Sequence, residues 1–158
     1  LLVDANFRRP ALHRVFGVSE GPGLGEVLSG EVPLAAATQT LKDNPNLRVL
    51  PAGAASKRVY ESLSTDALGK VLNDARGQYD CVYVDVAPAV VSGDAVAIAN
   101  RCDASILVAR TMSEKRGMIA RIKNELSEAR GEFFPERVGT ANNQLWFAAS
   151  GWRRSVLG

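Results

Sequence analysis

Several features that would identify a function directly are scarce or missing in this sequence of 158 residues. It has one histidine, and its two cysteines, Cys81 and Cys102, lack the spacing of a zinc or dithiol site. No run of 18 apolar residues occurs, so we expect any membrane anchor to lie outside these residues. The formal net charge of +2 is too small to indicate a nucleic-acid partner. What is left is the composition of an ordinary globular domain from a reducing compartment.

A phosphate-binding loop is also missing. No segment fits G-x-x-x-x-G-K-[ST], in which backbone N–H groups and a lysine hold the phosphates of a nucleotide. The stretch "GPGLGEVLSG" at 21–30 is rich in glycine, but it has no lysine followed by serine or threonine. We interpret its glycines as turn and helix boundaries.

Short apolar runs alternate along the chain with segments of helical periodicity. Because near-continuous apolar strands that alternate with helices are typical of parallel sheets, the pattern predicts an α/β fold with a mostly parallel sheet covered by helices on both faces. The predicted domain covers 1–130, and residues 131–158 form a divergent tail without a clear period. The expected strands are 1–4, 47–53, 81–86 and 104–110, and the expected helices are 10–17, 23–30, 64–80, 93–100 and 114–130.

Two aspartates lie at the carboxyl ends of predicted strands: Asp4 in "LLVD" and Asp85 in "CVYVDV". In parallel α/β sheets, ligands bind at the carboxyl ends of the strands. Asp85 alone has two interpretations, as a cap of the following turn or helix or as an acid that holds Mg²⁺ beside bound phosphates. Two acids at strand ends of one sheet could flank one metal–phosphate centre, and this pairing favours the second interpretation.

The order of these motifs resembles the bacterial tyrosine kinases of the BY-kinase type, which belong with the polysaccharide co-polymerases of capsule and exopolysaccharide export. "LLVDANFRRPALHRVFG" is similar to their Walker A′ segment, which reads D-x-D-x-R after three apolar residues. "GPGLGEVLSGEVPL" and "LRVLPAG" are similar to the segments that follow it. "YDCVYVDVAPAVVSGDAVAIANRCDASILVAR" resembles the Walker B strand, the next helix and the next strand. The resemblance covers about residues 1–130.

The resemblance implies ATP and Mg²⁺ as cofactors and a P-loop NTPase fold of the MinD/ParA-like type. Asp4 matches the first Walker A′ acid and Asp85 the Walker B acid, so both are expected near Mg²⁺ and the chemistry. Arg8 matches the Walker A′ arginine, and Arg110 matches an arginine before the nucleotide-proximal loop, so both are expected to contact the cofactor. Asn6 occupies the catalytic position of the second Walker A′ acid, where an amide carries no charge and is no general base.

Two further departures concern the ends of the family pattern. The family's first strand, P-loop and first helix precede the segment matched by Leu1, so the chain is expected to be N-terminally truncated relative to that pattern. The family also carries an acceptor cluster of tyrosines in its tail. The three tyrosines here, Tyr60, Tyr79 and Tyr83, lie outside the tail, and Tyr83 is expected inside a buried strand.

Three functions remain open from the sequence. The first is a partial ATP-binding kinase domain of exopolysaccharide or capsule biosynthesis, the second a catalytically inactive scaffold of the same machinery, and the third a ParA/MinD-type partition ATPase. The resemblance implies a co-polymerase membrane region as partner, in the same chain or another subunit, and a homo-oligomer at the cytoplasmic face of the membrane. Whether the domain is an enzyme depends on the missing P-loop and on Asn6.

Overall fold

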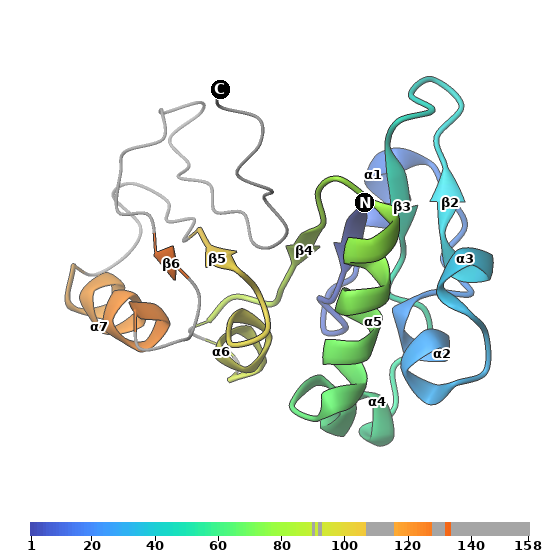
Figure 1. Cartoon of the computed structure of the whole chain (residues 1–158). Coiled ribbons are helices and arrows are strands. Elements are labelled where there is room, and N and C mark those ends of the chain that lie inside the picture. The colour runs from blue at the N-terminus through green and yellow to red at the C-terminus, as the bar shows by residue number, and fades with distance from the viewer. Residues whose placement is uncertain (90, 92, 107–115, 128–131, 134–158) are drawn as a thin grey trace.

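The computed structural model describes residues 1–89, 91, 93–106, 116–127 and 132–133. Short strands and helices alternate along this part of the chain (Figure 1). In chain order the elements are β1 (Leu2–Asp4), α1 (Leu12–Phe16), α2 (Leu24–Ser29), α3 (Leu34–Ala37), β2 (Gln39–Thr40), β3 (Arg48–Leu50), α4 (Lys57–Leu63), α5 (Asp66–Gln78), β4 (Tyr83–Asp85), α6 (Asp94–Ala99), β5 (Ala104–Ser105), α7 (Arg116–Ser127) and β6 (Glu132–Phe133).

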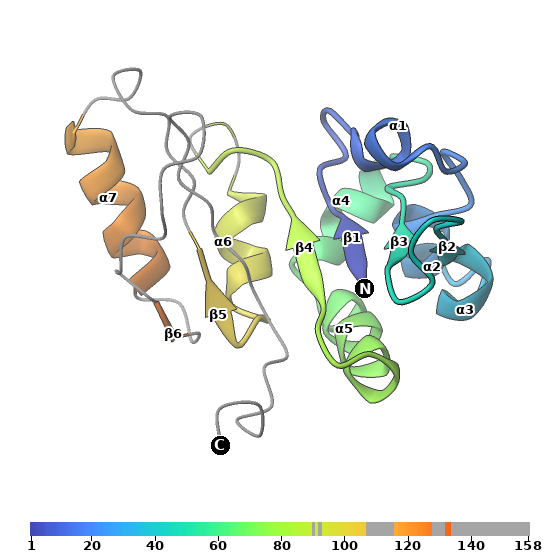
Figure 2. The same cartoon turned by 90° about the horizontal axis from the view of Figure 1, so that it is seen from above.

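The main sheet has the strand order β2-β3-β1-β4. Strand β1 pairs in parallel with both β3 and β4, whereas β2 runs antiparallel to β3. Helices lie on both sides of this sheet: seen from above, α1 and α5 lie on opposite sides of β1 (Figure 2). A second pair, β5-β6, is parallel as well. The α/β class with a mostly parallel sheet, predicted from the apolar runs, is therefore confirmed.

Helix α5 shows how directly the sequence determines the local structure. Thr65 caps its first turn by accepting a hydrogen bond from the N–H of Ala67. Leu68 and Leu72, one turn apart, are buried against the sheet together with Val71 and Ala75, as their helical spacing predicts.

Four short elements have no counterpart in the sequence prediction: α3, β2, α4 and β6. Helix α4 begins at a Ser56 cap and buries Val59 and Leu63, but its seven residues are too few for a clear period. Strand β6 lies inside the segment expected as a tail, and its Glu132 pairs with Ala104 of β5. The rest of that tail lies outside the described residues.

The expectation that Tyr83 is buried is wrong, because 46% of its surface is exposed. The run "CVYVDV" is apolar on both faces in sequence, but Val82 is buried and Tyr83 points to the opposite, more open face of β4.

The glycine-rich segment docks α2 onto the loop after β3. The N–H groups of Leu24 and Gly25 donate to the carbonyls of Pro51 and Ala52, each at 2.8 Å. The Glu26 carboxylate accepts from the N–H of Gly23 at 2.8 Å and from that of Ala54 at 3.0 Å. Desolvation raises the pKa of Glu26, but these backbone donors outweigh it and hold the pKa below its usual value. The glycines thus permit a close backbone contact besides marking helix ends.

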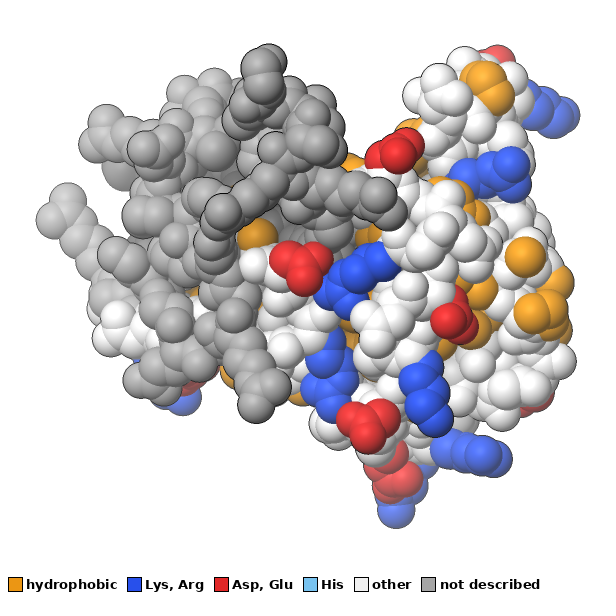
Figure 3. Space-filling model, viewed as in Figure 1, with side chains coloured by type: hydrophobic (Ala, Val, Ile, Leu, Met, Phe, Trp, Pro, Cys, Tyr) orange, Lys and Arg blue, Asp and Glu red, His pale blue; other side chains and the backbone are white. Residues whose placement is uncertain are grey.

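Two arginines connect α5 to the segment around α6. Arg76 donates to the carbonyl of Arg101 at 2.9 Å and pairs with Asp103 at 3.2 Å. Arg101 in turn donates to the carbonyl of Ser64 at 2.7 Å and to that of Thr65 at 3.0 Å. Acidic and basic side chains are interspersed on this face of the molecule (Figure 3). These contacts hold the C-terminal end of α6 against α5.

Candidate functional site

The two aspartates singled out by the sequence are direct neighbours in the sheet. In the parallel pair of β1 and β4, Asp4 and Asp85 are register partners at the last position of each strand. The N–H of Ala5 then donates to the carbonyl of Asp85 at 2.8 Å and extends the ladder beyond them. Register partners on parallel strands point to the same face, so both carboxylates belong to one site at the carboxyl edge of the sheet.

The Asp4 carboxylate is fully buried and organises the loop that follows β1. Its Oδ1 accepts from the N–H of Asn6 at 3.1 Å, and its Oδ2 accepts from the N–H groups of Ala11 at 3.0 Å and Leu12 at 3.1 Å. The latter two are otherwise orphaned donors at the start of α1, whose own N-cap residue provides no side-chain acceptor. Asp4 therefore contributes to the site mainly indirectly, by fixing the backbone of the loop after β1 and by adding negative charge.

Asp85 is the more accessible of the two carboxylates. Desolvation of the side chain, followed by the charge of Asp4, raises the pKa of Asp85 to about 6. A cation placed against Asp85 would relieve this repulsion. The carboxylate that faces solvent is thus also the one whose charged form the fold disfavours.

The remaining residues proposed from the sequence have different surroundings. The Oδ1 of Asn6 accepts from the N–H of Arg9 at 3.2 Å, so its amide helps to form a turn after β1. The guanidinium of Arg8 lies 3.6 Å from the carboxylate of Asp94 and 5.6 Å from the ring centre of Tyr60. Arg110 lies outside the described residues.

Tyr60 and Asp94 are partners of the site that the sequence did not indicate. Tyr60 belongs to α4, a helix too short to show a clear period in the sequence. Asp94 is the first residue of α6 and looks like an ordinary first-turn acid. Their contacts with Arg8 arise only from the tertiary packing of α4 and α6 around the loop after β1.

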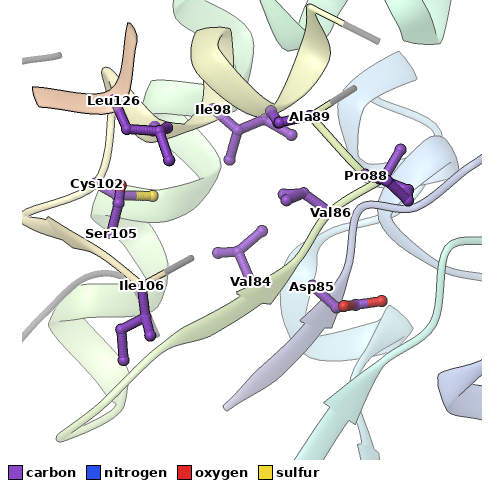
Figure 4. Close-up of a pocket in the computed structure, with 13 residues that line it drawn as sticks. Val84, Asp85, Val86, Pro88, Ala89, Ile98, Cys102, Ser105, Ile106 and Leu126 are labelled. Carbon is purple, nitrogen blue, oxygen red and sulfur yellow. The ribbon is translucent and has the colours of Figure 1, made fainter. Parts of the chain in front are cut away.

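An apolar cavity of about 360 Å³ lies on the other side of β4 (Figure 4). Its lining is contributed by β4 and the residues after it, by α6 and α7, and by the end of β5, and includes Val84, Val86, Ile98, Cys102 and Leu126. In Figure 4 the carboxylate of Asp85 points away from the side chains of Val84 and Val86. Strands β4 and β5 are not paired with each other among the described residues. The cavity thus lies beside β4, and Asp85 borders it although its carboxylate points away from Val84 and Val86.

The donor set fits Mg²⁺ in the manner usual for nucleotide sites. Among the described residues no cluster of three or more His, Cys, Asp or Glu side chains could enclose a metal ion. Mg²⁺, however, keeps several waters and is commonly held by one or two carboxylates together with the substrate's phosphates. An accessible Asp85 with the Asp4 charge behind it matches this requirement.

Stability should depend on pH through Asp85. Its pKa is higher in the folded protein than the ordinary value of 3.8, so the native state binds the extra proton and stability falls as pH rises from about 4 to about 6. The Asp85→Asn variant should lose this dependence and melt about 1–3 °C higher than the parent at pH 7.5, a small gain because the side chain is exposed. Thermal unfolding of both proteins between pH 4 and 8 measures it, and a parent whose stability rises over this range relative to the variant would contradict the assignment.

A mostly parallel α/β sheet with helices on both sides, and with acids at the carboxyl ends of neighbouring strands, is compatible with several α/β classes, P-loop NTPase domains among them. The solved structures similar to this chain include P-loop NTPase domains of kinases. The kinase domain of the Escherichia coli tyrosine kinase ETK superposes with a TM-score of 0.75 at 28% identity, over 89% of this chain and 57% of that one.

The chain is a homologue of bacterial tyrosine-protein kinases. It is 29% identical over 138 residues to "Putative tyrosine-protein kinase EpsB" of Ralstonia nicotianae, a match that covers 85% of this chain and 18% of that protein. It is 33% identical over 111 residues to "Succinoglycan biosynthesis transport protein ExoP" of Rhizobium meliloti, over 68% of this chain and 14% of the relative. The chain thus spans less than a fifth of these two relatives. No protein-family model matches it.

The comparisons therefore agree with the family resemblance seen in the sequence and with the predicted fold. None of the helices in the described part of the chain combines the length and the apolar character needed to cross a membrane.

Proposed function

We propose that this chain is part of an ATP-binding protein-tyrosine kinase domain that acts in exopolysaccharide or capsule biosynthesis. The observation that carries the proposal is the register pairing of Asp4 with Asp85 at the carboxyl edge of the sheet. The kinase relatives, and a relative named for succinoglycan biosynthesis and transport, support the reaction and the process. They favour a kinase over a partition ATPase.

In this proposal the two carboxylates have unequal roles. Asp85, accessible and with a raised pKa, holds Mg²⁺, and Asp4 fixes the loop after β1 while adding negative charge behind the ion. When bound, Mg²⁺ neutralises charge on the phosphates of ATP. Arg8 and Arg110 are the side chains proposed to contact those phosphates.

A second candidate, an inactive scaffold of the same export machinery, is favoured by Asn6. Its amide carries no negative charge, and its Oδ1 is used to accept from the N–H of Arg9. It therefore contributes neither a general base nor a charged metal ligand. A domain with this residue would bind nucleotide without efficient phosphoryl transfer, or would bind none.

The proposed partner is the co-polymerase membrane region, within the same polypeptide or in another subunit, and the proposed location is the cytoplasmic face of the membrane as a homo-oligomer. The proposal includes no nucleic-acid partner. The relative named as a transport protein supports the association with export.

Titration of the 158-residue chain with ATP and Mg²⁺, followed by NMR, tests the proposed function. Because the sequence lacks a phosphate cradle, we expect a dissociation constant in the millimolar range, with each missing charged hydrogen bond costing about 1.5–3 kcal/mol. Removal of Mg²⁺ with EDTA and the Asp85→Asn variant should each weaken binding about tenfold. Asp74→Asn, a change of an exposed acid on α5, is the matched control and should have no effect.

Each outcome separates the candidates. Micromolar binding would contradict the view that a phosphate cradle is missing. Binding that is unchanged in Asp85→Asn would remove Asp85 from the site, and absence of Mg²⁺-dependent binding would favour the scaffold.

A further inference from the structure

The backbone on both sides of Arg8 is held in place by hydrogen bonds. Asp4 accepts from the N–H groups of Asn6, Ala11 and Leu12, and Asn6 accepts from Arg9. The side chain of Phe7, only 6% exposed, is inserted into the core. Arg8 therefore projects outward from a fixed loop, and only its own side-chain torsions remain to be determined.

Two residues from other elements restrict those torsions. The ring of Tyr60 on α4 lies 5.6 Å from the guanidinium carbon of Arg8, within the range of a cation–π contact. The Tyr60 ring is itself held edge-on by Phe7, with ring centres 5.9 Å apart and planes at 67°. The carboxylate of Asp94 approaches the guanidinium to 3.6 Å. Among the described residues, Tyr60 is thus a partner for the planar group of the arginine and Asp94 a partner for its charge.

Arg8 and Asp94 belong to the segments that follow the two paired strands. Arg8 lies on the loop after Asp4, and Asp94 starts the helix reached by the loop after Asp85. Their ion pair joins these segments at the carboxyl edge that carries the two aspartates. The side chain of Arg8 nevertheless remains 46% exposed, so a ligand at this edge can reach it.

Stability alone is a poor explanation for this arrangement. Partly exposed ion pairs and exposed cation–π contacts contribute little to the free energy of folding. They can still select one orientation of a long side chain, and a pre-oriented guanidinium loses less freedom when it binds a phosphate group.

We propose that Tyr60 and Asp94 are positioning residues that hold the guanidinium of Arg8 ready for a phosphate group at the Asp4–Asp85 edge. The inference rests on the proposed function for its ligand, and names the two side chains that make Arg8 an effective phosphate contact. Tyr60 acts through its ring and not through its hydroxyl, because the contact is with the aromatic face. Asp94 acts through its charge.

The first test measures the orientation of Arg8 without any nucleotide. NMR relaxation of the Arg8 side-chain Nε–H group should show restricted motion in the parent chain and in Tyr60→Phe, which keeps the ring. Tyr60→Leu and Asp94→Asn should each release it to the mobility of an exposed arginine. Glu61→Gln, which removes an exposed ion pair of α4 with Lys57, is the matched control and should leave Arg8 unchanged. Equal mobility of Arg8 in all five proteins would overturn the proposal.

The second test measures the dissociation constant of ATP with Mg²⁺ for the same variants. Arg8→Ala should raise it about tenfold or more, as expected for loss of a hydrogen bond to a charged group. Tyr60→Leu and Asp94→Asn should raise it about threefold to tenfold, and Tyr60→Phe should restore the parent value. In a chain that already carries Arg8→Ala, Tyr60→Leu and Asp94→Asn should not weaken binding further. If the two residues had a merely structural role, they would still weaken binding in that background.

The outcomes distinguish a failure of the proposed function from a failure of the positioning role of Tyr60 and Asp94. If the parent and Arg8→Ala bind equally, or neither binds, the proposed function fails at Arg8 and the positioning role fails with it. If Arg8→Ala weakens binding but Tyr60→Leu and Asp94→Asn do not, only the positioning role is refuted. Tighter binding in Asp94→Asn would show that Asp94 competes with the phosphate instead of presenting Arg8 to it, and would also refute the proposal.

Discussion

The Asp4→Asn variant is expected to lose about 2–4 kcal/mol of unfolding free energy, because at least one buried N–H group is left facing another donor. In the parent, one carboxylate oxygen accepts from Asn6 and the other from Ala11 and Leu12. An amide has a single oxygen, so either orientation places its NH₂ group against one of these donors. The hydrogen bonds that remain also lose the strengthening effect of the charge. Chemical denaturation at pH 7 measures the loss.

Two matched substitutions give this prediction its control. Asp74→Asn makes the same change at an exposed position of α5 and should be close to neutral. Asp85→Asn makes it at the register partner and should be slightly stabilising, since it removes a carboxylate whose pKa is raised. Asp4→Asn as stable as the parent would show that the buried carboxylate is not what holds the loop after β1.

The Gly25→Ala variant is expected to destabilise the protein by about 3 kcal/mol or more, the upper range for overpacking combined with broken hydrogen bonds. A Cβ atom at Gly25 would collide with the backbone carbonyl of Ala54, which cannot move aside like a flexible side chain. Relief of the collision requires α2 to shift from the loop after β3. That shift would strain the bonds from Leu24 to Pro51 and from Gly25 to Ala52.

Gly77→Ala is the matched control within a helix. A Cβ atom at Gly77 in α5 meets nothing within 4 Å. Alanine is favoured over glycine in helices, so this variant should gain up to about 1 kcal/mol. Denaturation curves of the two variants should therefore shift in opposite directions, and a shift of Gly25→Ala in the stabilising direction would contradict the close contact.

The sequence is sufficient to predict those parts of the fold whose signals are local. Thr65 and the spacing of Leu68 and Leu72 define α5 without reference to the rest of the chain. The apolar runs before Asp4 and Asp85 likewise place both acids at strand ends. The sequence does not state which strands are neighbours, so only the register of β1 and β4 shows that the two acids lie side by side.

The parts of the fold and of the site that the sequence does not predict depend on contacts between distant segments. An apolar run does not reveal which face of a strand is covered, and the expectation for Tyr83 failed for this reason. The backbone donors that the Asp4 carboxylate meets in its own loop likewise have no signal in the sequence. Tyr60 and Asp94 carry no local signal at all, because their role follows from the packing of α4 and α6 beside Arg8.

The pairing of β1 with β4 also has a consequence for the order of events during synthesis. Asp4 leaves the ribosome well before its register partner, because the strand that brings this partner ends about 80 residues further along, at Asp85. Domains fold as units during translation, and closing so long a loop is slow relative to local helix formation. In a nascent chain that ends before β4, the carboxylate of Asp4, which is buried in the folded domain, thus has no neighbouring strand on that side. The site therefore arises in one late step, and a ribosome-bound chain arrested before Asp85 should carry none of it.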